Sequence, residues 1–178
     1  MGSRNYNNEH KELLERSMAG DSTAQFRLYE LYVDAMYNVV LRLVGHKEEA
    51  EDVLQDTFVD AFKNLHSFKY KSSFGAWIKR IAINKSINHI KIKRIQLAPL
   101  EDHAYYLTEE KEDPISFNIE KVKNAISNLP NGFKQIFSLY LFEGYTHKEI
   151  AEILDISEAT SKSQYHRAKK KLIEIMKT

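Results

Sequence analysis

Polar and basic side chains recur near the C-terminus at spacings that put them on one face of a helix. In the stretch "LDISEATSKSQYHRAKKKL", Leu154 to Leu172, this face consists of Lys162, Ser163, His166, Arg167 and Lys170. Lys and Arg can neutralise phosphates and donate to guanine edges, and a Ser hydroxyl can serve a phosphate or a base. The residue types therefore predict a face that can read DNA sequence.

The same charge run has a plainer interpretation. Lysines in the last turns of a helix are often only a solvated surface that complements the helix dipole. That interpretation covers Lys169, Lys170, Lys171 and Lys177. The residues that precede the charge run favour DNA binding over a merely solvated surface. Thr146 with Glu149 three residues later is the capping-box pattern of a helix start. Residues 155–157 then leave only a short turn before a second helix, capped by Ser157, which is typical of a helix-turn-helix.

Helical periodicity extends over most of the chain. Apolar residues recur at spacings of three and four from Thr23 to Val44, and again from Glu48 to Leu65, where an acidic face opposes the apolar stripe. The aromatic segment "HSFKYKSSFGAW" interrupts this pattern before a helical composition resumes in "FGAWIKRIAINKSINHIKIKR". Three shorter helical patterns follow Pro114, each closed by Pro, Gly or a polar turn: "ISFNIEKVKNAISNL", "PNGFKQIFSLYLFEG" and "YTHKEIAEILDIS".

The periodicity lapses between Gln96 and Pro114, where acidic residues accumulate. No alternating pattern with a hairpin turn occurs anywhere, so the chain is predicted to be all-α. We expect two small helical domains joined by an acidic linker, with the helix-turn-helix in the second. The expected bounds are residues 1–95 for the first domain, 96–115 for the linker and 116–178 for the second domain.

Composition narrows the function classes. The chain has 178 residues, of which 43% are hydrophobic and 29% charged, as in folded water-soluble proteins. It contains no Cys, which excludes disulfides, thiolate metal sites and cysteine nucleophiles. No apolar run reaches the ~20 residues of a membrane span, and "MGSRNYNNEH" lacks the apolar core of a secretory signal, so a cytoplasmic location is expected. Net charge is only +1, so the placement of charge carries the information.

An enzymatic function finds little support in the sequence. His46 with Glu49, and His147 with Glu149, resemble helical metal ligands, but neither pair belongs to the paired Glu and Glu-x-x-His pattern of a di-iron bundle. The chain also has no Gly-rich phosphate loop and no nucleophile elbow. We therefore expect no catalytic residues, no metal and no cofactor.

Two separated stretches resemble the bacterial sigma-70 superfamily of RNA polymerase sigma factors, and specifically its extracytoplasmic function (ECF) group. "AEDVLQDTFVDAFKNLHSF" and "SSFGAWIKRIAINKSINHIKIKR" are similar to the family's region 2, which binds polymerase and engages and melts the minus 10 promoter element. "LPNGFKQIFSLYLFEGYTHKEIAEILDISEATSKSQYHRAKKKL" is similar to region 4, which binds the minus 35 element. The resemblance is nearly full length, and two motifs in the right order are more specific than either alone.

The resemblance implies roles for particular residues. Asp52, Gln55 and Asp56 match the surface that docks on the clamp helices of the polymerase β′ subunit. The minus 10 contacts would come from Phe68, Asn84, Lys79 and Arg80, with Phe68 and Asn84 near a flipped base of the nontemplate strand. The minus 35 contacts would come from Lys162, Ser163, Gln164, His166 and Arg167. Further phosphate contacts are expected from Lys85, Lys91, Lys93 and Arg94, and a core role from Trp77.

Three residues depart from the family pattern. Asp155 stands where Gly is common in the turn, and Asp adopts the left-handed conformation at modest cost. Ser161 replaces a common Val, so its buried hydroxyl needs a partner, most simply a backbone carbonyl one turn earlier. Gln164 replaces a common Arg, which changes the expected promoter preference.

The resemblance also implies partners: core RNA polymerase, through the β′ clamp helices and the β flap, and promoter DNA. Many members of the family are held inactive by an anti-sigma protein, so such a protein is a family-level expectation, and no membrane insertion is expected. Two other functions stay open from the residues alone. A repressor or activator would explain the helix-turn-helix but not the acidic and aromatic residues upstream, and a helical scaffold would explain neither.

Overall fold

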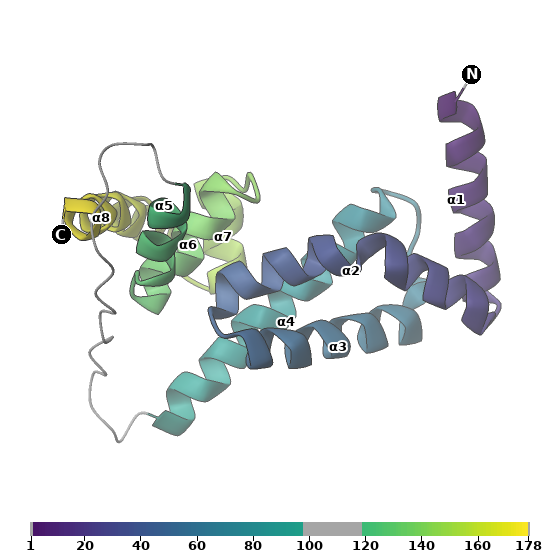
Figure 1. Ribbon diagram of the computed structural model, residues 1–178, viewed down its shortest axis with the longest axis horizontal. Helices are drawn as coiled ribbons and strands as arrows, with labels where there is room; N and C mark the ends of the chain where they lie inside the picture. Colours follow the sequence, from purple (N-terminus) through teal and green to yellow (C-terminus); the bar gives the residue numbers. More distant parts are fainter. Residues whose placement is uncertain (1, 98–118, 178) are drawn as a thin grey trace. The chain divides into compact units, whose positions relative to one another are not determined.

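The computed structural model describes residues 2–97 and 119–177, and every regular element in those two ranges is a helix (Figure 1). The chain is therefore all-α. It divides into two compact units, residues 1–90 and 91–178. The helices are α1 (Gly2–Met18), α2 (Ser22–Val44), α3 (Lys47–Lys63), the 3-10 turn η1 (Leu65–Ser67), α4 (Phe74–Leu97), α5 (Ile119–Ser127), α6 (Asn131–Leu141), α7 (His147–Leu154) and α8 (Glu158–Lys177).

The first unit is built on an apolar core shared by α1, α2, α3 and α4. On α3 the predicted stripe is buried, with Ala50, Val53, Leu54, Phe58 and Ala61 all facing the core. Helix α4 packs on more than one side, because Ile78, Ala82, Ile83 and Ile87 are all buried. The burial of these stripes fixes which residues of α3 and α4 remain available to a partner.

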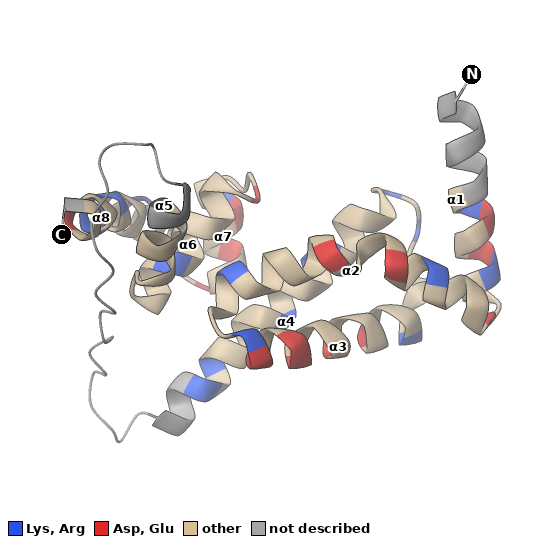
Figure 2. Ribbon diagram, in the orientation of Figure 1, with Lys and Arg blue, Asp and Glu red and all other residues tan. Residues whose placement is uncertain are grey.

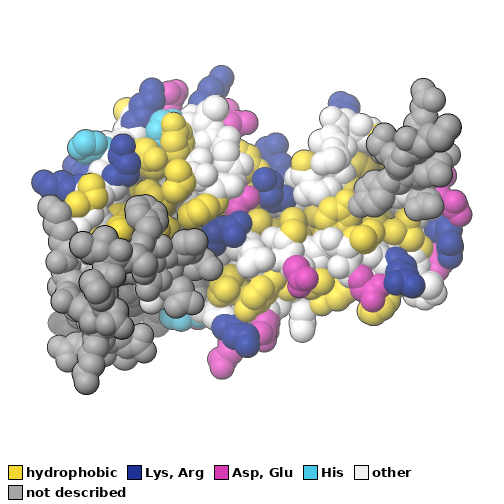
Figure 3. Space-filling model, turned by 45° about the horizontal axis from the view of Figure 1, so that its top comes forward, with side chains coloured by type: hydrophobic (Ala, Val, Ile, Leu, Met, Phe, Trp, Pro, Cys, Tyr) yellow, Lys and Arg dark blue, Asp and Glu magenta, His cyan; other side chains and the backbone are white. Residues whose placement is uncertain are grey.

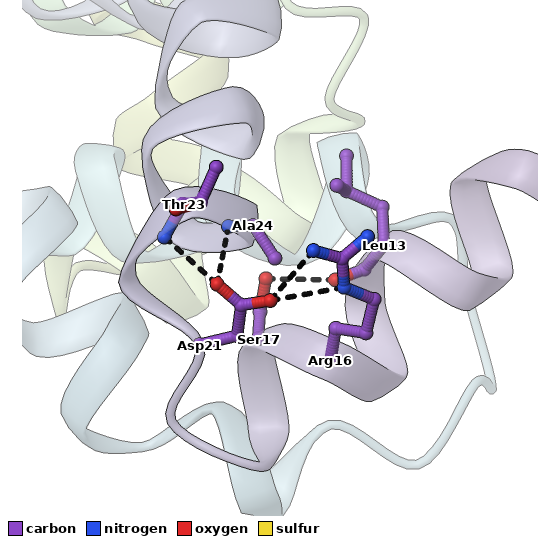
Figure 4. Close-up of polar contacts among 6 residues, drawn as sticks. All are labelled: Leu13, Arg16, Ser17, Asp21, Thr23 and Ala24. Carbon is purple, nitrogen blue, oxygen red and sulfur yellow. Dashed lines mark hydrogen bonds and ion pairs between the residues drawn. The ribbon is translucent and has the colours of Figure 1, made fainter.

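A tight turn joins α1 to α2 (Figure 4). Asp21 is the N-cap of α2, and its Oδ1 accepts hydrogen bonds from the backbone amides of Thr23 (2.9 Å) and Ala24 (3.2 Å). Its Oδ2 accepts from Arg16 Nη2 (2.7 Å) and Nε (2.9 Å), while Ser17 Oγ donates to the Leu13 carbonyl (2.7 Å). One carboxylate therefore satisfies free amides of α2 and anchors the last turn of α1.

Helix α1 was not among the elements expected from the sequence. Most of "GSRNYNNEHKELLERSM" is polar, and its apolar residues gather only toward the end. In the structure Leu14 is buried, and Leu13 and Met18 pack partly buried against the same core. The helix therefore depends on packing against the rest of the first unit, which local periodicity does not reveal.

The second unit contains α5 to α8 around a smaller core. Ile126, Leu129, Phe137 and Ala168 are buried, and Tyr165, Leu172 and Ile175 of α8 pack against them. Residues 98–115 of the predicted linker lie outside the described residues. The first two positions of that predicted linker, 96 and 97, are the end of α4, so the helix runs further than expected. No helix within the described ranges has the length and apolar character needed to cross a membrane.

Candidate nucleic-acid interface

The turn between α7 and α8 forms as the sequence predicts. Thr146 caps α7: its Oγ1 accepts from the Glu149 amide (3.3 Å), and Glu149 Oε2 accepts from the Thr146 amide (2.8 Å). Asp155 ends α7 in the left-handed conformation with φ of 57°. Ser157 Oγ then accepts from the Thr160 amide (3.0 Å) at the start of α8. The two helices are thus joined by a defined helix-turn-helix connection.

Four of the five predicted minus 35 residues share the exposed face of α8: Lys162, Ser163, His166 and Arg167. We call these four the α8 face. Lys162 forms an ion pair with Glu158 one turn earlier (2.6 Å), and this partner is the main reason that the pKa of Glu158 is lowered. Ser163 Oγ donates to the Thr160 carbonyl (3.0 Å), and the side chain is exposed. Figure 3 shows Lys, Arg and His side chains gathered on the second unit.

Gln164 differs from the α8 face in its surroundings. Its side chain is half-buried, and its Oε1 lies 3.6 Å from the position that a Cβ on Gly132 would occupy. Gly132 belongs to the first turn of α6. Gln164 therefore lies against the start of α6, and the α8 face is formed without it.

The expected partner of Ser161 was wrong. Ser161 is fully buried, but its Oγ lies 3.0 Å from Nδ1 of His147, the first residue of α7, rather than on a carbonyl of its own helix. Sequence reasoning considered His147 only as a metal-ligand candidate. One sequence signal could have revealed the pair. Ser161 is a polar residue on the buried side of α8, and His147, at the start of α7, has ring nitrogens that can bond to it.

His147 also belongs to a cluster of three rings. It stacks on Tyr140 with ring centroids 4.6 Å apart at 18°, and it meets Tyr165 at 5.6 Å and 63°. The ring centroids of Tyr140 and Tyr165 lie 4.5 Å apart. Burial raises the pKa of Tyr165, and nearby Tyr140 adds to that shift. The Lys169 ammonium lies over the Tyr165 ring, 5.2 Å from its centroid, so this lysine covers the cluster.

The aromatic segment before α4 places its rings differently from the simple expectation for base capture. Phe68 is only 5% exposed and contacts Phe74 and Trp77, with ring centroids 5.8 and 5.4 Å away. Tyr70 is 48% exposed and lies 4.9 Å from Phe68, in the left-handed conformation with φ of 55°. The buried Phe68 ring therefore packs against Tyr70 and leaves little of its own surface exposed to a base. Trp77 packs against the core, as the sequence predicts.

The polar residues of α4 fall into two groups. Asn84 and Arg80 are exposed, and Lys79 is half-buried. Lys85, an expected phosphate contact, instead pairs with Asp60 of α3 (2.5 Å), and His89 one turn later meets Glu49 of the same helix (2.8 Å between Nε2 and Oε2). These two pairs bridge α3 and α4. Sequence reasoning missed them because each joins residues far apart in the chain.

The acidic surface of α3 is open to a partner. Asp52, Gln55 and Asp56 are all exposed, and their spacing puts them on one face with Val59, which is 48% exposed. We call these four residues the α3 face. Figure 2 shows acidic residues along α3 and basic residues toward the end of α4. An exposed aliphatic side chain among carboxylates suits a protein partner that offers both apolar and basic groups.

Comparisons with known proteins match the same two regions. Residues 28–94 fit the family model described as sigma-70 region 2, and residues 119–172 fit the model described as sigma-70, region 4. The ECF RNA polymerase sigma factor SigF of Caulobacter vibrioides is 30% identical over 171 residues, which cover 94% of this chain and 93% of that protein.

A second relative, the ECF RNA polymerase sigma factor BldN of Streptomyces coelicolor, is 29% identical over 171 residues. This match covers 93% of the present chain but 65% of BldN. Among solved structures, the sigma factor RpoE in complex with the anti-sigma factor NepR from Bartonella quintana superposes with a TM-score of 0.60 at 22% identity. The match covers 85% of this chain and 96% of that one, and at 22% identity it shows a common fold and nothing more.

Proposed function

The chain belongs to the ECF group of the sigma-70 family of RNA polymerase sigma factors, and from this premise we propose how its own residues carry out initiation. The α3 face binds the β′ clamp helices of core RNA polymerase. The α8 face reads the minus 35 element, and α4 engages the minus 10 element as it opens. The proposed domain bounds are residues 1–95 and 116–178, with residues 96–115 as linker, and the proposed compartment is the cytoplasm, where bacterial transcription occurs.

One observation supports this proposal most strongly: the α3 face and the α8 face are both exposed, in one chain and in the family's order. A DNA-binding regulator would need only the α8 face. The α3 face has carboxylates and an aliphatic side chain that bind no DNA phosphate, because like charges repel. A protein partner for α3 together with a DNA partner for α8 is what a sigma factor requires.

For the minus 10 element, we propose that Tyr70 and Asn84 meet the displaced strand, while Phe68 supports Tyr70. An exposed ring can stack on an unpaired base, which contributes about 1–3 kcal/mol. A side-chain amide can donate to and accept from the edge of that base. Arg80 and Lys79 add phosphate contacts. The free energy for melting then comes from binding within the holoenzyme, so no nucleotide hydrolysis and no cofactor is required.

Run-off transcription with core polymerase over a genomic promoter library tests the proposal as a whole. Transcripts that start at defined sites and share upstream elements are the expected result. An anti-sigma protein stays a family-level expectation that the same assay can examine with candidate proteins added. If the chain binds promoter duplexes but not core polymerase, the sigma factor role is wrong and a repressor or activator takes its place.

The α3 face can be tested separately. The double substitution Asp52→Arg with Asp56→Arg puts positive charge where the partner is expected to be basic, and affinity for core polymerase should fall about tenfold or more. Glu51→Arg is the control for the single substitution Asp52→Arg, because both change the charge of α3 by the same amount and Glu51 is an exposed acid of α3 outside the α3 face. Equal loss in the control would show that only the net charge of the helix matters.

A further inference from the structure

We propose that His147 is the positioning residue of α8: it acts through Ser161 to set how the α8 face is presented to DNA. The inference rests on the proposed function, because it needs α8 to be the helix that reads the minus 35 element. Ser161 is buried, and the His147 ring is half-buried against Tyr140 and Tyr165, so we assign both residues to positioning rather than to DNA contact.

The contact between the two residues is specific. Ser161 is fully buried, and its Oγ lies 3.0 Å from His147 Nδ1. The hydroxyl donates to this nitrogen in one imidazole tautomer and accepts from it in the other. A buried hydroxyl without a partner is destabilising, so the structure keeps α8 where this bond can form. The carbonyl one turn earlier, that of Ser157, accepts from the Ser161 amide (3.0 Å), and the Ser161 hydroxyl bonds instead to the His147 ring.

The imidazole is itself held in place. Tyr140, in the last turns of α6, stacks on it with ring centroids 4.6 Å apart, and the ring centroid of Tyr165 of α8 lies 5.6 Å away. His147 is the first residue of α7, directly after the Thr146 cap. One ring thus contacts α6 and α8 while its backbone starts α7. A fixed ring converts a single hydrogen bond into a constraint on the register and depth of α8.

The place of Ser161 on α8 makes this constraint relevant to reading. Ser161 precedes Lys162 and Ser163 directly, and His166 and Arg167 follow within two turns. Base recognition depends on hydrogen bonds that weaken steeply with changes in distance and angle. If Ser161 must seek another partner, α8 shifts or rotates and the four side chains of the α8 face move together. Discrimination between bases should then fall more than nonspecific attraction to phosphates.

Four variants separate positioning from simple stability. His147→Phe keeps the ring contacts but removes the bond to Ser161. His147→Asn removes the ring but keeps a hydrogen-bonding atom close to the position of Nδ1. His147→Phe combined with Ser161→Ala removes both partners, so no buried hydroxyl is left unpaired. Lys148→Ala is the matched control, because Lys148 is the exposed neighbour of His147 in the same turn of α7.

The assay uses holoenzyme reconstituted from the full chain and core polymerase. Duplexes with a randomised minus 35 element upstream of a fixed minus 10 element are first selected with the wild-type holoenzyme. The selected duplex and its single-base variants then give a discrimination ratio for each holoenzyme. We expect His147→Phe to lower this ratio about fivefold, while binding of core polymerase is unchanged. His147→Asn and the double variant should recover most of the ratio, and Lys148→Ala should match the wild type.

Wild-type discrimination in His147→Phe would overturn the inference, and so would an equal loss in His147→Asn and His147→Phe. A lower melting temperature with an unchanged ratio in the folded fraction would show that His147 only stabilises the second unit. If the wild-type holoenzyme itself selects no minus 35 sequence, the proposed function fails, and the inference fails with it. Failure of the inference alone is recognised by selection in the wild type without a change in the variants.

Discussion

The side chains of α8 have different surroundings. Arg167 is exposed with its guanidinium available, whereas Gln164 lies against Gly132 and Lys169 covers the Tyr165 ring. Residues that neighbour one another in the sequence therefore differ in environment: some are exposed and others contact the rest of the second unit. Contacts that read bases are expected from the exposed residues.

Arg167→Ala should relax discrimination at one position of the minus 35 element. An Arg that donates two hydrogen bonds to a guanine typically contributes about 1–3 kcal/mol of discrimination, so the preference at that position should fall by about fivefold or more. Competition between the selected duplex and its single-base variants measures this. Lys171→Ala is the control, because Lys171 is an exposed cation of α8 that pairs with Glu174 (3.3 Å). Unchanged preference in Arg167→Ala would remove this residue from the reading contacts.

Asn84→Ala should impair open complexes far more than closed ones. An amide that binds the edge of an unpaired base can do so only after the strands separate, and loss of such a hydrogen bond costs about 1 kcal/mol, or roughly fivefold in the open fraction. Permanganate reactivity of unpaired thymines reports open complexes, and gel retardation at low temperature reports closed ones. Asn88→Ala is the matched control, an exposed Asn one turn later on α4. Equal loss of both complexes would contradict base capture by Asn84.

At the scale of elements, the docking of α1 should depend on pH through His10. His10 Nε2 lies 2.8 Å from the Tyr32 hydroxyl, and its ring meets Tyr32 and Phe74 at centroid distances of 5.9 and 6.3 Å. Burial lowers the pKa of His10 from its ordinary value of 6.5. The unfolded chain therefore binds this proton more tightly, so the contribution of His10 is complete above pH 6.5 and falls as the pH drops below it.

Amide hydrogen exchange in α1, compared between pH 7 and pH 5.5, measures this effect. Opening of α1 should become more frequent at the lower pH, after correction for the intrinsic exchange rate. His10→Gln keeps a donor near the position of Nε2 but does not titrate in this range, so its α1 should show a smaller change. The same change in both proteins would assign the pH dependence to other groups.

The cap of α2 depends on the ionised carboxylate of Asp21. Hydrogen bonds from Arg16 and from the Ala24 amide lower the pKa of Asp21, so its stabilising effect is present above its ordinary pKa of 3.8 and is lost as the pH falls through the lowered value. At pH 7, Asp21→Ala should lower the melting temperature by a few degrees, because α2 loses its cap and α1 its anchor. Asp21→Asn keeps an acceptor for the amides and should retain part of the stability. A melting temperature unchanged by Asp21→Ala would contradict this role.

Across the whole molecule, the sequence predicted the features that local patterns encode. The helices that became α2 to α8 follow from apolar periodicity, and Thr146 with Glu149 follows from the spacing of a capping box. Features that depend on distant residues were not predicted. Ser161 was expected to bond to a backbone carbonyl one turn earlier, but its hydroxyl bonds to His147 of another helix. The two ion pairs that bridge α3 and α4 have no local sequence pattern. Tertiary packing also decides that Phe68 is buried and Tyr70 exposed.

The charge of the whole molecule leads to a last prediction. Net charge is +1, so long-range attraction to DNA comes from local groups of basic residues rather than from the chain as a whole. Lys170 is exposed on the same side of α8 as the α8 face but one turn beyond His166, and it was not among the predicted minus 35 contacts, so we expect it to bind a phosphate, which carries no sequence information. Lys170→Gln should reduce the slope of log affinity against log salt by about 0.9 while base preference stays constant. Arg167→Ala should instead change base preference, and a loss of preference in Lys170→Gln would contradict this division between phosphate and base contacts.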